Sequence, residues 1–217
     1  MNRNEHMSLA ERALDMQAFF DRKADGYDDV HQSFMGTKTS LTDALPDGTH
    51  RILDLGGGTG LELFPLFERF PDAQVTVIDV SEKMLDLLMK RPFADHVRPV
   101  FGDFFEVGFG TDYDAVISTS ALHHFEPDDK RILWRKVYDC LRTGGLFLNA
   151  DKISKNRTAE ADAFAFYRAN KDSGEYPHID TPLAPSTEVQ LLEDTGFHHI
   201  TVTLTDRDNY RLFRGAK

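Results

Sequence analysis

The sequence predicts an α/β fold built on a mostly parallel sheet. Between about residues 50 and 150, short runs rich in β-branched residues alternate with longer segments whose apolar residues recur at helical spacing. No internal repeat or low-complexity stretch interrupts this alternation. Near the C-terminus, two further apolar runs flank a short polar turn, which indicates a terminal antiparallel hairpin.

Five short apolar runs are expected to form the parallel strands. They cover residues 51–55, 74–80, 97–101, 113–118 and 146–150. The first leads directly into a cluster of glycines, so the chain is expected to turn sharply there. The terminal hairpin should pair the alternating run at 200–204 with residues 210–214, across a turn at 206–209.

Helical segments are expected before and between these strands. An N-terminal helix carries Leu9, Ala13, Met16 and Phe20 on one face. Because it precedes the first strand, it should pack across the sheet or over its cleft. Further helices should follow the glycine cluster and the second, fourth and fifth strands, the last of them near residues 158–171. A final helix should precede the hairpin.

Capping residues predict where some of these helices begin and end. The candidates for helix starts are Ser81, Asp128 and the pair Thr187 and Gln190, which has the spacing of a capping box. The candidates for helix ends are Gly144-Gly145, after the long helix that follows the fourth strand, and Gly196, after the final helix.

Charge and composition limit the kinds of partner. The 217-residue chain has 25 basic and 36 acidic residues, and its formal net charge is −11. This field repels polyanions, so nucleic acid is disfavoured and neutral, zwitterionic or cationic small molecules are favoured. The single cysteine, Cys140, excludes an internal disulfide and suits a reducing compartment. With no apolar leader and no stretch of roughly 18 apolar residues, a cytoplasmic protein without membrane contact is expected.

The most informative motif is ILDLGGGTG at residues 52–60, between an expected strand and an expected helix. Glycines at 56, 58 and 60 let the backbone approach a ligand at the carboxyl edge of the sheet, where open α/β folds bind ligands. A dinucleotide fingerprint requires Gly or Ala where this chain has Leu61. Asp54 would repel a pyrophosphate and attract an ammonium group, directly or through water. The loop therefore favours a ligand with an amino-acid end.

Two further carboxylates follow the next two strands. Asp79, at the end of the second strand, can accept hydrogen bonds from both hydroxyls of a ribose. Asp103 follows the third strand, where it could accept from the exocyclic amine of adenine while Phe104 or Phe105 packs on the ring. Together these groups predict a ligand with adenine, ribose, no phosphate and an amino-acid tail, which is S-adenosylmethionine.

Five segments resemble the class I S-adenosylmethionine-dependent methyltransferases, of the small-molecule type. They cover about residues 50–151 in the family's order and read LDLGGGTG, VTVIDVSEKML, FGDFFEV, YDAVISTSALHHF and LRTGGLFLNAD. The resemblance implies a Rossmann-like sheet of seven strands, mostly parallel, with the last pair reversed and helices on both faces. The expected organisation is a single domain over residues 1–217, with a helical cap or lid in 1–48 and an insert in 151–185 that shapes the acceptor pocket.

The resemblance also implies S-adenosylmethionine as cofactor and S-adenosylhomocysteine as product. Asp54 and the glycines would line the methionine end, Asp79 would hold the ribose, and Asp103 would meet the adenine. The full expected set is Asp54, Gly56, Gly58, Gly60, Asp79, Val80, Met84, Gly102, Asp103, Phe104, Ser118 and Ser120. The family reaction is an in-line displacement at the sulfonium methyl carbon, so the protein mainly positions a nucleophile about 3 Å away and excludes water.

Absent motifs favour a small-molecule acceptor with an O or N nucleophile. Enzymes that methylate exocyclic amines of nucleic acids often carry an (Asn/Asp/Ser)-Pro-Pro-(Tyr/Phe) motif after the fourth strand, where this chain reads STSA. Cytosine C5 enzymes use a Pro-Cys nucleophile, whereas Cys140 lies in an apolar helical stripe. The sequence is also compatible with a homodimer.

His123, His124 and Tyr27 are the candidate catalytic residues. The histidines follow the fourth strand beside the expected methyl group, and a packing or capping role is their alternative. Tyr27 belongs to an aromatic and charged segment that in similar proteins covers the cofactor; an ordinary helix-end tyrosine is its alternative. The candidate substrate contacts are Tyr27, His123, Tyr176 and His178. No metal is expected, because adjacent histidines lack metal-ligand spacing.

Other functions stay open at this point. A role in tRNA modification, or the use of a modified S-adenosylmethionine, would keep the fold and change the chemistry. A carboxy-S-adenosylmethionine synthase would need an arginine near the sulfonium, and the sequence assigns none. A non-catalytic cofactor-binding subunit that acts through a partner is another class. A nicotinamide oxidoreductase is disfavoured by Leu61 and Asp54.

Overall fold

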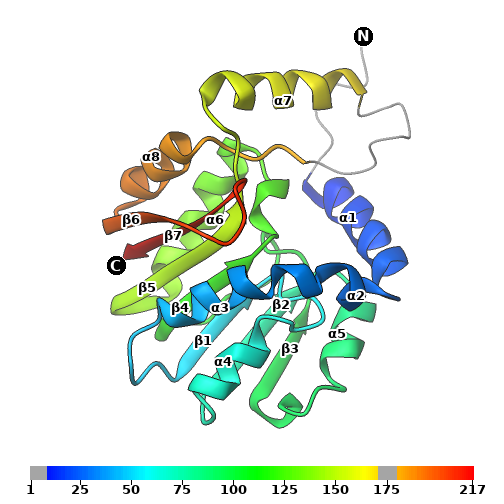
Figure 1. Ribbon diagram of the computed structural model, residues 1–217, viewed down its shortest axis with the longest axis vertical. Helices are drawn as coiled ribbons and strands as arrows, with labels where there is room; N and C mark the ends of the chain where they lie inside the picture. The colour runs from blue at the N-terminus through cyan, green and yellow to red at the C-terminus, as the bar shows by residue number, and fades with distance from the viewer. Residues whose placement is uncertain (1–8, 171–179) are drawn as a thin grey trace.

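One mixed sheet of seven strands forms the centre of the protein. The computed structural model describes residues 9–170 and 180–217 (Figure 1). The strands are β1 (Arg51–Leu55), β2 (Gln74–Asp79), β3 (Val97–Phe101), β4 (Tyr113–Thr119), β5 (Leu141–Lys152), β6 (His198–Leu204) and β7 (Tyr210–Ala216). Their order is β3-β2-β1-β4-β5-β7-β6, with β7 antiparallel to both neighbours and the other pairs parallel. The expected sheet and its terminal hairpin are confirmed.

Helices surround this sheet (Figure 1). They are α1 (Leu9–Lys23), α2 (Tyr27–His31), α3 (Met35–Asp43), α4 (Leu63–Arg69), α5 (Glu82–Leu88), α6 (Pro127–Cys140), α7 (Arg157–Asn170) and α8 (Pro185–Thr195). Short 3₁₀ helices are η1 (Gln32–Phe34), η2 (Ala94–His96) and η3 (Leu122–His124). None of the helices in the described ranges is long and apolar enough to cross a membrane.

Two apolar cores lie on opposite faces of the sheet. Successive residues of a strand point to opposite faces, so the central strand β1 contributes to both. Ile52 belongs to the core that also contains residues of α3, α4 and α5, whereas Leu53 belongs to the core with residues of α6 and α8. Burial on both faces explains why β1 reads as a nearly continuous apolar run.

Two helix boundaries agree with the sequence. Ser81 has an extended backbone, and its Oγ accepts a hydrogen bond from the Met84 N–H at 3.3 Å, so it caps α5 as predicted. Gly196 ends α8 with a φ of 112°, in the region that favours glycine. Cys140 is buried in the core, as its position on an apolar stripe indicated.

Both predicted boundaries of α6 are wrong. The helix begins at Pro127, and Asp128 lies inside its first turn instead of capping it. Proline supplies a φ suited to the first helical position and lacks an N–H that would need a partner, so the helix starts without a side-chain cap. At the other end, α6 stops at Cys140 and β5 begins at once, so Gly144-Gly145 lie within the strand.

Gly145 has a role in the sheet instead. The pairing of β4 with β5 is irregular between Tyr113 and Ala115. A Cβ at Gly145 would lie 3.0 Å from the backbone oxygen of Tyr113, so glycine permits the close approach of the two strands. The glycine pattern that ends helices cannot predict this close approach of Tyr113, because Tyr113 lies about thirty positions earlier in the chain.

The capping box predicted for α8 is also wrong. This helix begins without a side-chain cap. Thr187 Oγ1 donates to Glu160 Oε2 of α7 at 2.7 Å, and Gln190 Nε2 donates to Asp194 at 2.9 Å. A tertiary partner on α7 therefore uses the hydroxyl that the sequence pattern assigned to the helix terminus.

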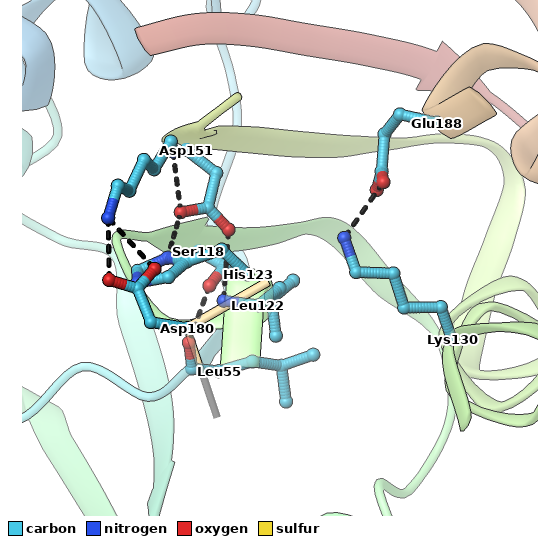
Figure 2. Close-up of polar contacts among 9 residues, drawn as sticks. Leu55, Ser118, Leu122, His123, Lys130, Asp151, Asp180 and Glu188 are labelled. Carbon is cyan, nitrogen blue, oxygen red and sulfur yellow. Dashed lines mark hydrogen bonds and ion pairs between the residues drawn. The ribbon is translucent and has the colours of Figure 1, made fainter. Parts of the chain in front are cut away.

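A buried ion pair joins α6 to α8. Lys130 Nζ donates to Glu188 Oε2 at 2.8 Å, and the two side chains are 3% and 4% exposed (Figure 2). Burial raises the pKa of Glu188, and the charge of Lys130 opposes that rise. A second pair on the same helices, Arg131 and Asp194 at 3.0 Å, is 52% and 44% exposed. The two pairs differ mainly in burial, so they form a matched comparison.

Removing one partner of the buried pair is expected to be costly. Glu188→Leu leaves the Lys130 ammonium buried without a counter-charge and should lower the free energy of unfolding by about 3–5 kcal/mol. The double variant K130M/E188L should recover most of that loss, because no buried charge remains. Arg131→Ala should cost less than about 1 kcal/mol. Urea unfolding followed by circular dichroism measures all three; a double variant as unstable as E188L would contradict this account.

Candidate functional site

A deep cleft opens at the carboxyl ends of β1, β2, β3 and β4. Its volume is about 980 Å³, including the open mouth. The turns after these strands form its floor and walls, α1 and the start of α2 cover it, and Tyr167 of α7 also lines it. Parallel strands present their following turns at one edge of a sheet, which is where open α/β folds hold ligands.

The glycine loop between β1 and α4 forms one wall of the cleft. Gly56 and Gly58 line it, with φ of +73° and +53°. A Cβ at Gly56 would lie 2.5 Å from the Cβ of Ala121, so a larger residue does not fit there. At Gly58 the nearest atom to such a Cβ is Asp79 Oδ2, at 4.0 Å. The loop therefore leaves open space in front of this carboxylate.

Asp54 lies beneath the glycine loop rather than in the cleft. Its side chain is fully buried, and neither carboxyl oxygen has a hydrogen-bond partner among the described residues. Burial, and then the charge of neighbouring Glu62, raises the pKa of Asp54 well above its usual value. Glu62 in turn accepts from Lys38 Nζ at 2.7 Å. A cationic group held above the loop would favour the ionised form of Asp54 and oppose this rise in its pKa.

Asp79 ties two turns together and keeps accepting capacity free. Its Oδ2 accepts the N–H of Gly58 at 2.9 Å, and its Oδ1 accepts the N–H of Ser81 at 2.8 Å. A carboxylate offers about four lone-pair directions, so about two remain for a ligand. Burial raises the pKa of Asp79 to about 6, although both backbone hydrogen bonds oppose the rise. The residue lines the cleft and fits a pair of ribose hydroxyls.

The turn after β3 forms another wall of the cleft. Asp103 Oδ1 accepts the N–H of Phe105 at 3.0 Å, and the Asp103 carbonyl accepts two further N–H groups of the same turn. Burial raises the pKa of Asp103. Phe104 also lines the cleft, and its ring centroid lies 5.8 Å from that of Phe125. A carboxylate beside apolar rings fits the edge and the face of an adenine.

N-terminal residues lie over the cleft, which is one of the two positions expected for the first helix. Met16 and Phe20 of α1 and Tyr27 at the start of α2 all line it. The Tyr27 ring stacks on that of His31, with centroids 3.9 Å apart. Burial, followed by nearby carboxylates, raises the pKa of Tyr27 far above its usual value, so its phenol stays protonated at neutral pH. Tyr27 can therefore donate a hydrogen bond but cannot serve as a general base.

Polar contacts tie this cover to the turns beneath it. Ser81 Oγ donates to Asp21 of α1 at 2.6 Å, so the N-cap of α5 also anchors the covering helix. Thr59 Oγ1 of the glycine loop donates to Asp28 of α2 at 2.6 Å, and Arg91 pairs with the same carboxylate. The cover is thus positioned by the same loops that line the cleft.

The two histidines after β4 occupy different places. His124 lines the cleft, and its ring lies edge to face with that of Phe20, 5.8 Å away. His123 lies outside the lining, with its Nδ1 2.6 Å from Asp151 Oδ1, while Asp151 Oδ2 accepts the N–H of Leu122 at 3.0 Å (Figure 2). Burial alone would raise the pKa of Asp151, but the charge and hydrogen bond of His123 hold it below its usual range. His123 thus fixes the turn that presents His124.

Most of the residues expected from the sequence meet in this cleft. Those that line it are Gly56, Gly58, Asp79, Val80, Met84, Gly102, Asp103, Phe104, Ser120, Tyr27 and His124. Those outside its lining are Asp54, Gly60, Ser118 and His123. Tyr176 and His178 fall outside the described residues.

Gly60 and Ser118 make structural contacts outside this lining. A Cβ at Gly60 would clash with Leu88 of α5, so this glycine permits the helix to pack against the loop. Ser118 is fully buried in β4, and its Oγ donates to the carbonyl of Leu55 at 2.7 Å (Figure 2). Within residues 9–170 and 180–217, no group of three or more His, Cys, Asp or Glu side chains is placed to hold a metal ion.

Sequence reasoning missed several residues of the lining. These are Arg12, Asp15, Phe125 and Tyr167. The spacing that predicted α1 could have found Arg12, because it lies one helical turn before Met16. No sequence signal separates Tyr167 from the other aromatic residues of α7, since only the tertiary fold brings it to the cleft.

The mixed sheet and the glycine loop, together with acids after β2 and β3, define the fold of a class I methyltransferase. A family model described as a methyltransferase domain matches residues 52–145, the segment from β1 into β5 that builds most of the cleft. Over this segment, which is less than half of the chain, the protein is similar to methyltransferase domains, and its sheet has the fold of the class I S-adenosylmethionine-dependent methyltransferases.

Two relatives illustrate the range of this family. A malonyl-[acyl-carrier protein] O-methyltransferase of Priestia megaterium is 33% identical over 97 residues, which are 45% of this chain and 35% of that protein. A carboxy-S-adenosyl-L-methionine synthase of Nautilia profundicola is 26% identical over 167 residues, covering 70% of this chain and 71% of that protein. This chain spans about a third to a half of the length of the first two O-methyltransferase relatives.

Solved structures agree on the fold. A putative O-methyltransferase of Nostoc punctiforme has a TM-score of 0.72 at 18% identity, over 91% of this chain and 60% of that one. The DhpI protein in complex with S-adenosylhomocysteine has a TM-score of 0.74 at 18% identity, over 94% of this chain and 96% of that one.

The raised pKa of Asp79 predicts how ligand binding depends on pH. The protonated carboxyl loses accepting capacity, so affinity for S-adenosylhomocysteine should fall as the pH drops through about 6. At pH 5 the affinity should be about 10-fold weaker than at neutral pH, since one pH unit separates this from the pKa. Calorimetric titration between pH 5 and 8 measures this. Asp79→Asn should bind at least about 10-fold more weakly at pH 7.5 and lose most of this pH dependence. An equally steep profile in the variant would show that another group titrates.

Proposed function

We propose that this protein transfers the methyl group of S-adenosylmethionine to an O or N atom of a small-molecule acceptor. The observation that carries the proposal is Asp79 facing open space at Gly58, with about two lone-pair directions free for a ribose. When bound, the cofactor supplies an activated methyl group, so the chain's own residues have to bind, orient and exclude water.

The cleft combines two kinds of lining, which supports two ligands. The glycine loop and the acids at Asp79 and Asp103 suit the polar groups of the cofactor. Apolar and aromatic side chains also line the cleft, namely Met16, Phe20, Phe105, Phe125 and Tyr167. Aromatic walls favour an apolar or flat acceptor that carries one hydroxyl or amine.

His124 is the group best placed to take a proton from such an acceptor. It lines the cleft with its ring beside that of Phe20, whereas His123 lies outside the lining and Tyr27 stays protonated. A histidine side chain is the most common general base in enzymes. We assign His124 the removal of the acceptor's proton.

Modified-cofactor chemistry has less support in the cleft. A carboxylated sulfonium ligand requires a free arginine near the methyl position. Arg12 lines the cleft, but its two terminal nitrogens bind both oxygens of Asp129 at 2.6 and 3.0 Å. This arginine is therefore neutralised in the described structure, which favours the unmodified cofactor and methyl transfer.

Direct binding measurements test the class of ligand. Calorimetric titration with S-adenosylmethionine and S-adenosylhomocysteine should give micromolar affinities, whereas NADH should not bind, because Leu61 replaces a required glycine. A labelled methyl donor with apolar hydroxyl and amine compounds then reports turnover. If S-adenosylmethionine and S-adenosylhomocysteine bind but no compound is methylated, a non-catalytic cofactor-binding subunit is favoured. If neither of the two binds, the proposal is wrong.

Substitution of His124 tests the proposed base. For an acceptor found in that screen, His124→Gln should lower kcat by about 100-fold or more and leave the affinity for S-adenosylhomocysteine unchanged, because it removes a base and not a cofactor contact. His198→Gln is the matched control, since His198 is exposed on β6. An unchanged kcat in H124Q would contradict the assignment of the base.

A further inference from the structure

Lys136 of α6 reaches across to the turn that follows β3. Its Nζ donates to the backbone carbonyls of three residues there: Phe104, Phe105 at 3.3 Å and Val107 at 2.9 Å. An ammonium group has three N–H donors, so the three converging carbonyls match it in number. The same Nζ lies 4.6 Å from the ring centroid of Phe109. The side chain thus joins a helix to the wall of the cleft that carries Asp103.

One peptide group connects Lys136 to Asp103. The carbonyl of the Phe104–Phe105 peptide accepts from Lys136, and the N–H of the same peptide donates to Asp103 Oδ1 at 3.0 Å. In a trans peptide the C=O and N–H groups point in opposite directions. Lys136 and Asp103 therefore hold this peptide from its two sides. Linked hydrogen bonds polarise one another, so the ammonium strengthens the N–H that orients the carboxylate.

The two charges also act on each other directly. Burial lowers the pKa of Lys136, while the charges of Asp103 and Glu106 oppose that change. In return, Lys136 is among the groups that oppose the burial-driven rise in the pKa of Asp103. The lysine therefore favours the ionised carboxylate, which is the form that accepts hydrogen bonds at both oxygens.

We propose that Lys136 is the positioning residue for base recognition in this cleft, and that it makes the protein select adenine over hypoxanthine. It does so by holding the Phe104–Phe105 peptide so that the Asp103 carboxylate meets an exocyclic amine. Adenine presents such an amine, whereas hypoxanthine presents a carbonyl oxygen at the same place, which a carboxylate repels. This inference rests on the function proposed above.

Lys217 provides a matched control within the chain. Its Nζ also donates to backbone carbonyls, of Asp139 at 3.3 Å and Leu141 at 2.7 Å, and lies 5.1 Å from the ring centroid of Tyr138. It makes the same kinds of contact, but its acceptors lie outside the lining of the cleft, whereas Phe104 and Phe105, which accept from Lys136, are part of that lining. Substitution of either lysine should therefore lower the stability of the protein. Only substitution of Lys136 should also change the selectivity for the base.

The experiment compares two ligands that differ at one position of the base. Calorimetric titration of the full chain with S-adenosylhomocysteine and with S-inosylhomocysteine gives a ratio of affinities. The unchanged chain should prefer the adenine ligand, and Lys136→Met should reduce this preference by about 10-fold, as for loss of a hydrogen bond to a charged group. Lys217→Met should leave the ratio unchanged. Circular dichroism checks folding, and Lys136→Gln, which keeps an N–H donor, replaces K136M if that variant does not fold and should show a smaller loss in the same direction.

A double variant separates the route through Asp103 from other effects. In an Asp103→Asn background, Lys136→Met should cause no further change in the ratio, because the group that it orients is already altered. Two outcomes would overturn the assignment of Lys136 and leave the proposed function standing. In the first, the unchanged chain prefers the adenine ligand and K136M keeps that preference. In the second, both lysine variants lose the preference equally. If the unchanged chain binds neither ligand, the proposed function falls and this inference falls with it.

Discussion

The carboxylate of Asp79 ties together the turns on which the cleft depends. It accepts the N–H of Gly58 from the glycine loop and the N–H of Ser81 at the start of α5. Ser81 extends this connection to the N-terminal cover, because its hydroxyl donates to Asp21 of α1. One buried acid therefore sets the glycine loop, the first turn of α5 and the covering helix relative to one another. The space that a ligand would occupy lies between these three elements.

Burial of such an acid has an energetic cost that shapes the whole site. Burial raises the pKa of Asp79 to about 6 and raises that of Asp54 as well, so ionising either group opposes folding near neutral pH. Neither acid has a counter-charge that fully compensates it. A bound ligand that brings hydroxyl donors and a cationic end would relieve this cost. The two buried acids therefore lower the stability of the free chain and at the same time favour binding of the cofactor.

Two pairs of buried charges among the described residues have structural roles. Lys130 with Glu188 joins α6 to α8, and His123 with Asp151 holds the turn after β4 (Figure 2). His123 and His124, adjacent in sequence, differ in place: the His123 ring lies against Asp151 outside the lining of the cleft, and the His124 ring lines the cleft beside Phe20.

The sequence by itself determined the sheet, the terminal hairpin, the glycine loop and the acids at Asp79 and Asp103. These features follow from patterns within short segments, such as apolar runs of strand length and carboxylates placed directly after strands. Only the tertiary structure decided which of these residues face the cleft. Gly145 permits a close strand contact with Tyr113, Thr187 binds Glu160, and Asp54 lies under its loop. Each depends on a partner distant in the chain or on the depth of burial, and local spacing carries information about neither.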